Sequence, residues 1–169
     1  KTGMMYIYPF SYADENTTIQ LSMSEHNIID VLEAENVVIN GITFKNSSGN
    51  AIKGTDGKYF VVQNCKFIAN KITLTDFRCS GITTCYFLNT RAIITRDSFD
   101  SESAQEFWDD RNFIMNCFIE GAKATSADIA LSGNNCVMSH NFGSDQTNGA
   151  FAGFNGANMY FEYNEGVGN

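Results

Sequence analysis

Residues 60–67 read FVVQNCKF, and this short apolar segment returns along the chain with the same pattern of side chains. The other clear copies are VVINGITF at 37–44, SGITTCYF at 80–87 and NFIMNCFI at 112–119. Their last residues lie 23, 20 and 32 positions apart. Each copy is a strand-length run rich in β-branched and aromatic residues. A period of about 20–23 residues, with too little apolar surface in one copy to close a core, predicts that neighbouring copies stack.

A second, shorter set of apolar segments lies between these copies, and turn-forming residues fill the gaps. These segments include residues 72–74, 92–94 and 129–131; further copies of the first segment lie at 136–141 and 159–164, with a weaker one at 18–21. No stretch has the caps and period of a long helix. We therefore expect an all-β fold, a right-handed parallel β-helix of about six to seven coils, because parallel crossovers are almost always right-handed. A leucine-rich repeat has a similar period, but its Leu-x-x-Leu-x-Leu signature is absent.

Stacking the copies in register predicts which side chains share a column. Parallel strands lie about 4.8 Å apart, so equivalent residues of neighbouring copies lie above one another. A polar residue in the middle of each copy marks a bend, where stacked amides can hydrogen-bond along the axis. The predicted inward columns are Ile39, Val62, Ile82 and Ile114; Phe44, Phe67, Phe87 and Ile119; and Ile42, Cys65, Cys85 and Cys117, while the bend column is Asn64, Thr84 and Asn116.

Composition excludes several classes of protein. The chain has 169 residues, of which 43% are hydrophobic and 18% charged, so it can bury one core and is not of disordered composition. The formal net charge of -8 argues against a nucleic-acid or membrane-surface partner, because both attract an excess of Lys and Arg. The five Cys and two His lack zinc-ligand spacing, so we expect no metal site and cysteines that pack as small apolar groups. His140 lies inside a repeat copy, where we expect a structural role.

Several segments resemble the pectin-lyase-like family of right-handed parallel β-helix carbohydrate enzymes. Residues 1–9 (KTGMMYIYP) are similar to a strand that precedes the first coils in bacterial members, and residues 37–44 and 50–52 resemble the segments that follow it. Ser139-His140-Asn141 and Glu162-Tyr163-Asn164 resemble later coils. The resemblance implies a glycoside hydrolase whose catalytic carboxylates lie on coils beyond these. We therefore expect residues 1–169 to form one domain, a fragment of a longer protein that is inactive by itself.

A polar column supplies the candidate catalytic residues. Thr55-Asp56, Thr75-Asp76 and Thr95-Arg96-Asp97 recur at intervals of 20 residues. Carboxylates on adjacent coils would lie about 5 Å apart, close to the gap that retaining glycosidases use. We therefore predict Asp76 and Asp97 as catalytic residues. Turn-forming roles for these residues, and calcium binding by the acidic column, are the open alternatives.

An insertion in one coil supplies candidate substrate contacts. The spacing of 32 marks extra residues between Ser98 and Arg111, and these include the single tryptophan of the chain. An aromatic ring matches the apolar face of a pyranose, and a carboxylate accepts hydrogen bonds from its hydroxyls. The alternative is that the insertion folds its Trp onto the flank of the solenoid. The predicted substrate-binding residues are Trp108, Asp109, Arg78 and Arg96, the arginines being suited to sugar hydroxyls or carboxylates.

These observations favour the β-helix segment of a carbohydrate-active enzyme, a glycoside hydrolase acting on plant or host glycans. Its partner would be a polysaccharide or oligosaccharide, with no cofactor, in a secreted, cell-surface or periplasmic location. One alternative is a non-catalytic glycan-binding or structural β-helix, as in an adhesin or phage fibre. Another is a polysaccharide lyase, which usually needs calcium and a Lys or Arg base and fits the scarcity of lysine less well. The sequence predicts neither the glycan nor the oligomeric state.

Overall fold

The computed structural model describes residues 26–45, 50–89, 91–95, 111–121, 127–145, 149–154 and 156–167. These residues form short β-strands in three parallel sheets of six strands each, which we call sheets A, B and C. Sheet A contains β1 (Ile29–Leu32), β4 (Asn50–Lys58), β7 (Lys71–Arg78), β10 (Arg91–Thr95), β13 (Ala127–Ser132) and β16 (Gly149–Phe154). Sheet B contains β2 (Val38–Asn40), β5 (Val61–Gln63), β8 (Gly81–Thr83), β11 (Phe113–Met115), β14 (Val137–Ser139) and β17 (Tyr160–Glu162). Sheet C contains β3 (Thr43–Lys45), β6 (Lys66–Ile68), β9 (Tyr86–Leu88), β12 (Phe118–Glu120), β15 (Phe142–Ser144) and β18 (Glu165–Val167).

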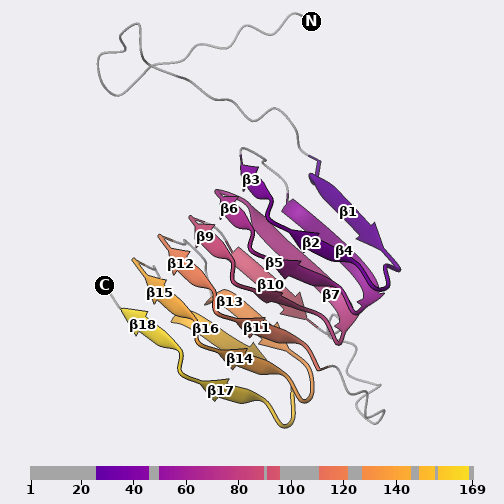
Figure 1. Ribbon diagram of the computed structural model, residues 1–169. Coiled ribbons are helices and arrows are strands. Elements are labelled where there is room, and N and C mark those ends of the chain that lie inside the picture. The colour runs from indigo at the N-terminus through magenta and orange to yellow at the C-terminus, as the bar shows by residue number, and fades with distance from the viewer. Residues whose placement is uncertain are drawn as a thin grey trace, which may run out of the picture.

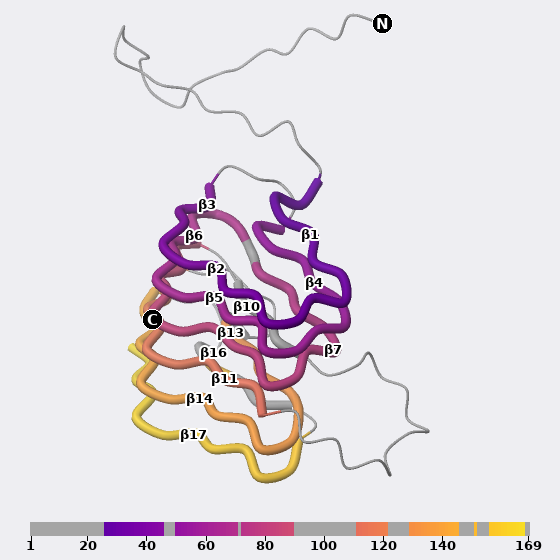
Figure 2. Tube along the Cα trace, turned by 45° about the vertical axis from the view of Figure 1, so that its right-hand side comes forward, coloured from indigo at the N-terminus to yellow at the C-terminus, as the bar shows by residue number. Residues whose placement is uncertain are grey.

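Successive strands of the chain belong to sheets A, B and C in turn, so three strands make one rung of a solenoid. Figure 1 shows the rungs stacked from β1–β3 at one end to β16–β18 at the other, and Figure 2 shows the same winding along the Cα trace. Every strand pair is parallel, and the described residues include no helix. The prediction of an all-β parallel solenoid is therefore confirmed. No helix in this part of the chain is long and apolar enough to span a membrane.

Two of the predicted inward columns line the core as expected. Ile39 is the register partner of Val62, Val62 of Ile82 and Ile82 of Ile114. These four side chains are buried. On sheet C the rings of Phe44, Phe67 and Phe87 stack with centroids 4.9 and 5.0 Å apart, and Ile119 continues the column. The strand spacing therefore sets the ring spacing, and apolar burial along the axis holds the rungs together.

The third column is buried only in part. Cys65, Cys85 and Cys117 lie between sheets B and C with 2–3% of their surfaces exposed, and each Sγ faces backbone carbonyls. The prediction for Ile42 is wrong, because its side chain is 42% exposed. Ile42 belongs to the terminal rung, where no described strand covers the far side. Asn141 continues the column instead of a cysteine.

The five cysteines permit a chemical test of this burial. All are free thiols; Cys79 is half-buried and the other four are buried. Burial raises the pKa of the Cys85 thiol well above its usual range, and raises that of Cys117 to about 12, so neither supplies a thiolate at mildly alkaline pH. We expect iodoacetamide to alkylate only Cys79 in the folded protein, and all five cysteines after denaturation, as counted by mass spectrometry. Labelling of Cys85 or Cys117 in the folded protein would contradict this packing.

One residue in left-handed conformation turns the chain between sheets B and C. Asn64, Thr84 and Asn116 have φ of 52°, 52° and 54°, which confirms the predicted bend column. The side-chain amide of Asn64 donates to Asn40 Oδ1 at 2.9 Å. This hydrogen bond joins Asn64 to the preceding rung, at a residue next to the bend column. Asparagine tolerates this conformation because its short polar side chain can hydrogen-bond locally, whereas a β-branched residue is strained there.

Thr84 is therefore expected to destabilise the folded state, because a β-branched residue is strained at this φ. We expect Thr84→Asn to raise the free energy of unfolding by about 1 kcal/mol, because the replacement relieves left-handed strain at a β-branched residue. The matched control is the reverse change, Asn116→Thr, which we expect to lower stability by a similar amount. Urea unfolding of both variants measures the pair. Equal midpoints for Thr84→Asn and the parent protein would show that the corner carries no such strain.

Candidate functional site

The polar column predicted from the sequence lies where sheet A turns toward sheet B. Thr75 is the register partner of both Thr55 and Thr95, which confirms that the three threonines share a column. Asp56 and Asp76 follow the first two, with φ of 53° and 58°. Aspartate is among the residues that accept left-handed backbone, so each marks a local kink inside its strand, β4 or β7. Asp56 is exposed and Asp76 is half-buried.

Basic residues lie beside these carboxylates. Lys58 is the register partner of Arg78, and both are exposed. Lys58 Nζ lies 2.8 Å from Glu35 Oε1, and this hydrogen-bonded ion pair raises the pKa of Lys58. A hollow of about 330 Å³ opens at this corner, and we call it the corner hollow. Its lining residues are Glu33, Glu35, Asp56, Gly57, Lys58 and Arg78.

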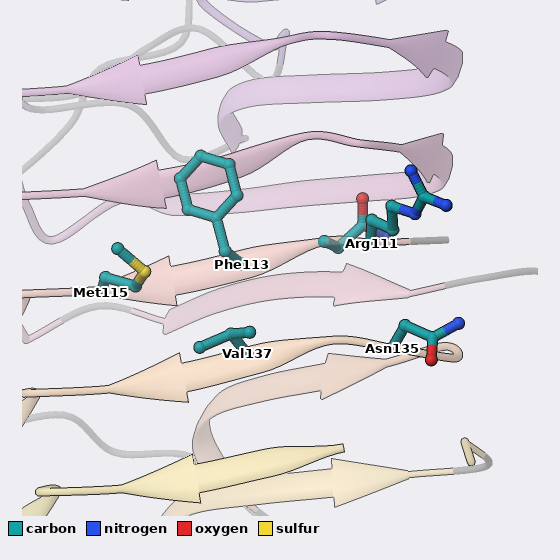
Figure 3. Close-up of a pocket in the computed structure, with 6 residues that line it drawn as sticks. Arg111, Phe113, Met115, Asn135 and Val137 are labelled. Atoms are coloured by element: carbon teal, nitrogen blue, oxygen red, sulfur yellow. The ribbon is translucent and has the colours of Figure 1, made fainter. Parts of the chain in front are cut away.

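A second hollow lies on the outer face of sheet B, and we call it the sheet B groove. Its volume is about 610 Å³, and β11 and β14 form its floor. Figure 3 shows the Phe113 ring turned away from Val137, with Arg111 and Asn135 together at one end and Met115 at the other. The lining residues are Arg111, Asn112, Phe113, Met115, Asn135 and Val137.

A glycine on the neighbouring strand gives the Phe113 ring its place. A Cβ on Gly81 would lie 2.5 Å from Phe113 Cδ2 and 2.3 Å from Phe113 O, so only glycine fits under the ring. Because Phe113 leans over Gly81, the surface between Phe113 and Val137 stays open. The repeat pattern did not predict this groove. The signal in the sequence was Gly81, which stands where the other copies carry Val, Phe or Tyr on the outer face.

Arg111 and Asn135 occupy equivalent corner positions on two rungs. Their φ values are 43° and 53°, and the backbone N–H of Arg111 donates to Asn134 O at 3.1 Å. Asn112, between Arg111 and Phe113, is fully buried and donates from Nδ2 to Phe77 O at 2.7 Å. This buried amide anchors the start of β11. The groove therefore combines an apolar floor with guanidinium and amide groups at one end, a combination suited to a ligand with one apolar and one polar face.

The described residues include only some of the predicted site. Asp76 and Arg78 lie at the A–B corner, and Arg78 lines the corner hollow. Asp97, Arg96, Trp108 and Asp109 lie outside the described residues, as does most of the insertion, which joins β10 to β11. Arg111, the last residue of the insertion and the one that the structure describes, lines the sheet B groove. In the described part of the chain, no group of three or more His, Cys, Asp or Glu side chains is arranged to hold a metal ion.

His140 occupies a bend between sheets B and C. Its φ is 54°, its side chain is exposed, and its ring lies 4.9 Å from that of Tyr163 on the next rung. Its backbone N–H donates to Glu162 O at 3.2 Å. These contacts belong to the bend and support the structural role expected from the sequence.

Sheet C carries an outer aromatic column that sequence analysis missed. The rings of Tyr86, Phe118 and Phe142 stack with centroids 5.2 and 5.1 Å apart, and Lys66 Nζ lies 5.0 Å from the Tyr86 centroid. The Tyr86 hydroxyl donates to Glu120 Oε2 at 2.5 Å, and this hydrogen bond raises the pKa of Tyr86. The rings cover one another's faces, so they offer a sugar only their edges. This column is therefore a poor stacking platform, unlike the open side of Phe113.

The fold and its hollows define the class: a parallel β-solenoid with a charged corner hollow and an amphipathic groove on its surface. No family model matches the chain, and comparisons with curated proteins and with solved structures find no match.

Proposed function

We propose that the chain is a right-handed, pectin-lyase-like β-helix segment that binds a polysaccharide or oligosaccharide along its A–B edge. The observation that carries the proposal is the sheet B groove, in which Phe113 and Val137 provide an apolar floor and Arg111 and Asn135 provide hydrogen-bond donors. A pyranose has one apolar face and a rim of hydroxyls, so it matches such a surface. The corner hollow lies along the same edge of the solenoid, on earlier rungs.

The rung spacing supports a linear ligand. Equivalent positions recur along the axis about every 4.8 Å, which is close to the length of one sugar ring in an extended chain. Charged side chains recur with the rung spacing at the corner. Lys58 and Arg78 are register partners on neighbouring strands, and Asp56 lies one rung before Asp76. A glycan lying along this edge would meet similar groups at each ring.

Within this proposal the activity that we favour is glycoside hydrolysis, with Asp76 and Asp97 as the two catalytic carboxylates, one acting as the nucleophile and the other as the acid/base. Carboxylates on adjacent rungs suit the gap of about 5 Å used by retaining enzymes. Trp108, Asp109, Arg78 and Arg96 would contact the substrate. A secreted or cell-surface location fits such a ligand.

A non-catalytic glycan-binding solenoid is the second candidate, and one observation favours it. Asp56 is exposed and Asp76 only half-buried at an open corner, whereas a general acid usually needs a desolvated carboxyl to hold its proton near neutral pH. Such a protein would bind a glycan without turning it over.

Glycan binding by the whole chain tests the proposal. A glycan microarray identifies a ligand, and calorimetry then measures its Kd. We expect Arg111→Ala and Phe113→Ala each to weaken binding about tenfold, which corresponds to about 1.4 kcal/mol. Lys45→Ala, an exposed change on sheet C, is the matched control and should leave Kd unchanged. Failure of every glycan to bind, or equal Kd values for all three variants, would overturn the proposal.

Turnover of the bound glycan separates the two candidates. If the protein is a hydrolase, Asp76→Asn and Asp97→Asn should each lower kcat at least a hundredfold with little change in Kd, because each removes one of the two carboxylates that the reaction needs. If the full-length protein binds the glycan with no release of reducing ends, the non-catalytic candidate stands and both variants affect Kd alone.

A further inference from the structure

The outer face of sheet C carries a column of aromatic side chains with a charged side chain at each end, and the proposed function does not use it. The first residue of each strand on this face points outward, and register pairing places these residues in one column. Phe118 at the centre is 38% exposed, and the two rings beside it are half-buried. From the second rung to the last, the column reads Lys66, Tyr86, Phe118, Phe142 and Glu165; we call it the sheet C column.

The sheet C column leaves an apolar surface that nothing in the chain's own described part covers. Its rings are occupied face to face by one another, so their edges point to solvent. Ile68 and Leu88, half-buried on the same face, extend the apolar surface to the side. Aromatic surface at the centre with charges at the rim is the usual composition of a protein–protein interface.

The order of the column is self-complementary. Phe118 is the middle of five residues, with Lys66 two rungs away on one side and Glu165 two rungs away on the other. A half-turn about an axis that lies in the interface plane at the level of Phe118, perpendicular to the solenoid axis, places Lys66 of one copy opposite Glu165 of a second copy. Tyr86 then meets Phe142, and Phe118 meets itself. Such a twofold contact is isologous, so the ion pair forms twice.

The alternative twofold arrangement is unfavourable. If two copies packed with their solenoid axes parallel, Lys66 would meet Lys66 and Glu165 would meet Glu165. Like charges placed together at an interface oppose association. Lys66 and Glu165 therefore favour the antiparallel arrangement. Glu120, beside Phe118 on the same face, meets its own copy there, with its carboxylate held by the Tyr86 hydroxyl.

We propose that the sheet C column is a homodimer interface, in which two copies of this chain pack face to face with antiparallel solenoid axes. The five residues span about 19 Å along the axis, four strand spacings, so the interface is at the small end of specific contacts. We therefore expect a dimer that forms with rising protein concentration. The sheet B groove lies on a different sheet and remains open in this dimer.

Sedimentation velocity over a concentration series tests the interface, at about 0.15 M salt so that long-range repulsion between the acidic chains is screened. The parent protein should shift from monomer to dimer. Lys66→Glu should weaken dimerisation at least tenfold, because the twofold axis converts both ion pairs to repulsions, and Glu165→Lys should do the same. Lys45→Glu, the same charge change on the same sheet outside the column, should dimerise like the parent protein apart from the effect of net charge.

Mixing the two single variants gives the decisive result. A Lys66→Glu chain and a Glu165→Lys chain are complementary across the proposed contact, so the mixture should form a heterodimer although neither variant dimerises alone. The double variant, which exchanges the two charges, should dimerise by itself. Circular dichroism establishes that each variant is folded. A parent protein that stays monomeric at every concentration, or folded variants that fail to associate on mixing, would overturn the proposal and leave this face to a different partner.

Discussion

Phe67→Ala is expected to lower the free energy of unfolding by about 3–5 kcal/mol, the range for removing a buried aromatic ring and leaving a cavity. Phe67 is fully buried, and its ring stacks between those of Phe44 and Phe87. Its loss therefore removes two ring contacts and opens a gap that neighbouring rungs cannot fill without shortening the strand spacing. A small domain has only about 5–15 kcal/mol of stability, so the variant should lose a large fraction of it.

Urea unfolding followed by circular dichroism measures this effect. Val61→Ala is the matched control, because Val61 lies on the adjacent strand of the same rung but points outward and is half-buried. We expect that control to cost less than about 1 kcal/mol. A loss below that value for Phe67→Ala would mean that the phenylalanine column does not hold the rungs together.

Asn141→Leu is expected to cost about 2–4 kcal/mol, because each buried polar group left without a partner costs about 1–3 kcal/mol. Asn141 Oδ1 accepts from the backbone N–H of Cys117 at 2.9 Å, and Nδ2 donates to Ile114 O at 3.0 Å. Nδ2 also donates to Asn164 Oδ1 at 2.9 Å, so the two amides form a ladder along the axis. Leucine has a similar size but satisfies none of these groups.

Two controls separate hydrogen bonding from packing at this column. Asn141→Cys introduces the residue type that the column carries at position 117, and we expect a smaller loss, because a thiol can donate weakly to a backbone carbonyl as Cys117 does to Met115 O. Asn164→Leu changes the same column on the terminal rung, where the side chain is only half-buried, and should cost less than Asn141→Leu. Equal losses for the Leu and Cys variants at position 141 would show that the amide bonds do not stabilise the ladder.

Alignment of the repeat copies was enough to predict the ladders of the core. Ile39 through Ile114, and Phe44 through Ile119, follow from strand period and register alone, since a parallel stack places equivalent residues over one another. Ile42 was predicted wrongly because the alignment cannot tell that no described strand covers the far side of its rung. The amide ladder was missed because it replaces cysteine by asparagine within one column, and such a replacement looks like a break in the repeat.

The bends show a further limit of sequence reasoning. Asn64 and Asn116 are residue types that favour left-handed backbone, and their bend was predicted. Tyr59, Cys79 and Tyr163 have φ of 55°, 49° and 51°, although their types disfavour it. Their left-handed conformation is imposed by the stacking of the rungs. Each rung must turn at the same position as its neighbours to keep the strands in register. The sheet B groove was missed for a related reason. It depends on the orientation of the Phe113 ring over Gly81, which the repeat pattern does not specify.

The inter-rung hydrogen bonds also determine how this molecule responds to mechanical force. Each joins residues on adjacent rungs, as in Val61 N–H to Val37 O and Gly81 N–H to Phe60 O. A pull on the two ends of the described stack therefore breaks the bonds of an outermost rung first, because the load enters there and that rung has a described neighbour on one side only. The solenoid should extend in a series of small, nearly equal steps, one for each rung released, and rewind in the reverse order when the load falls.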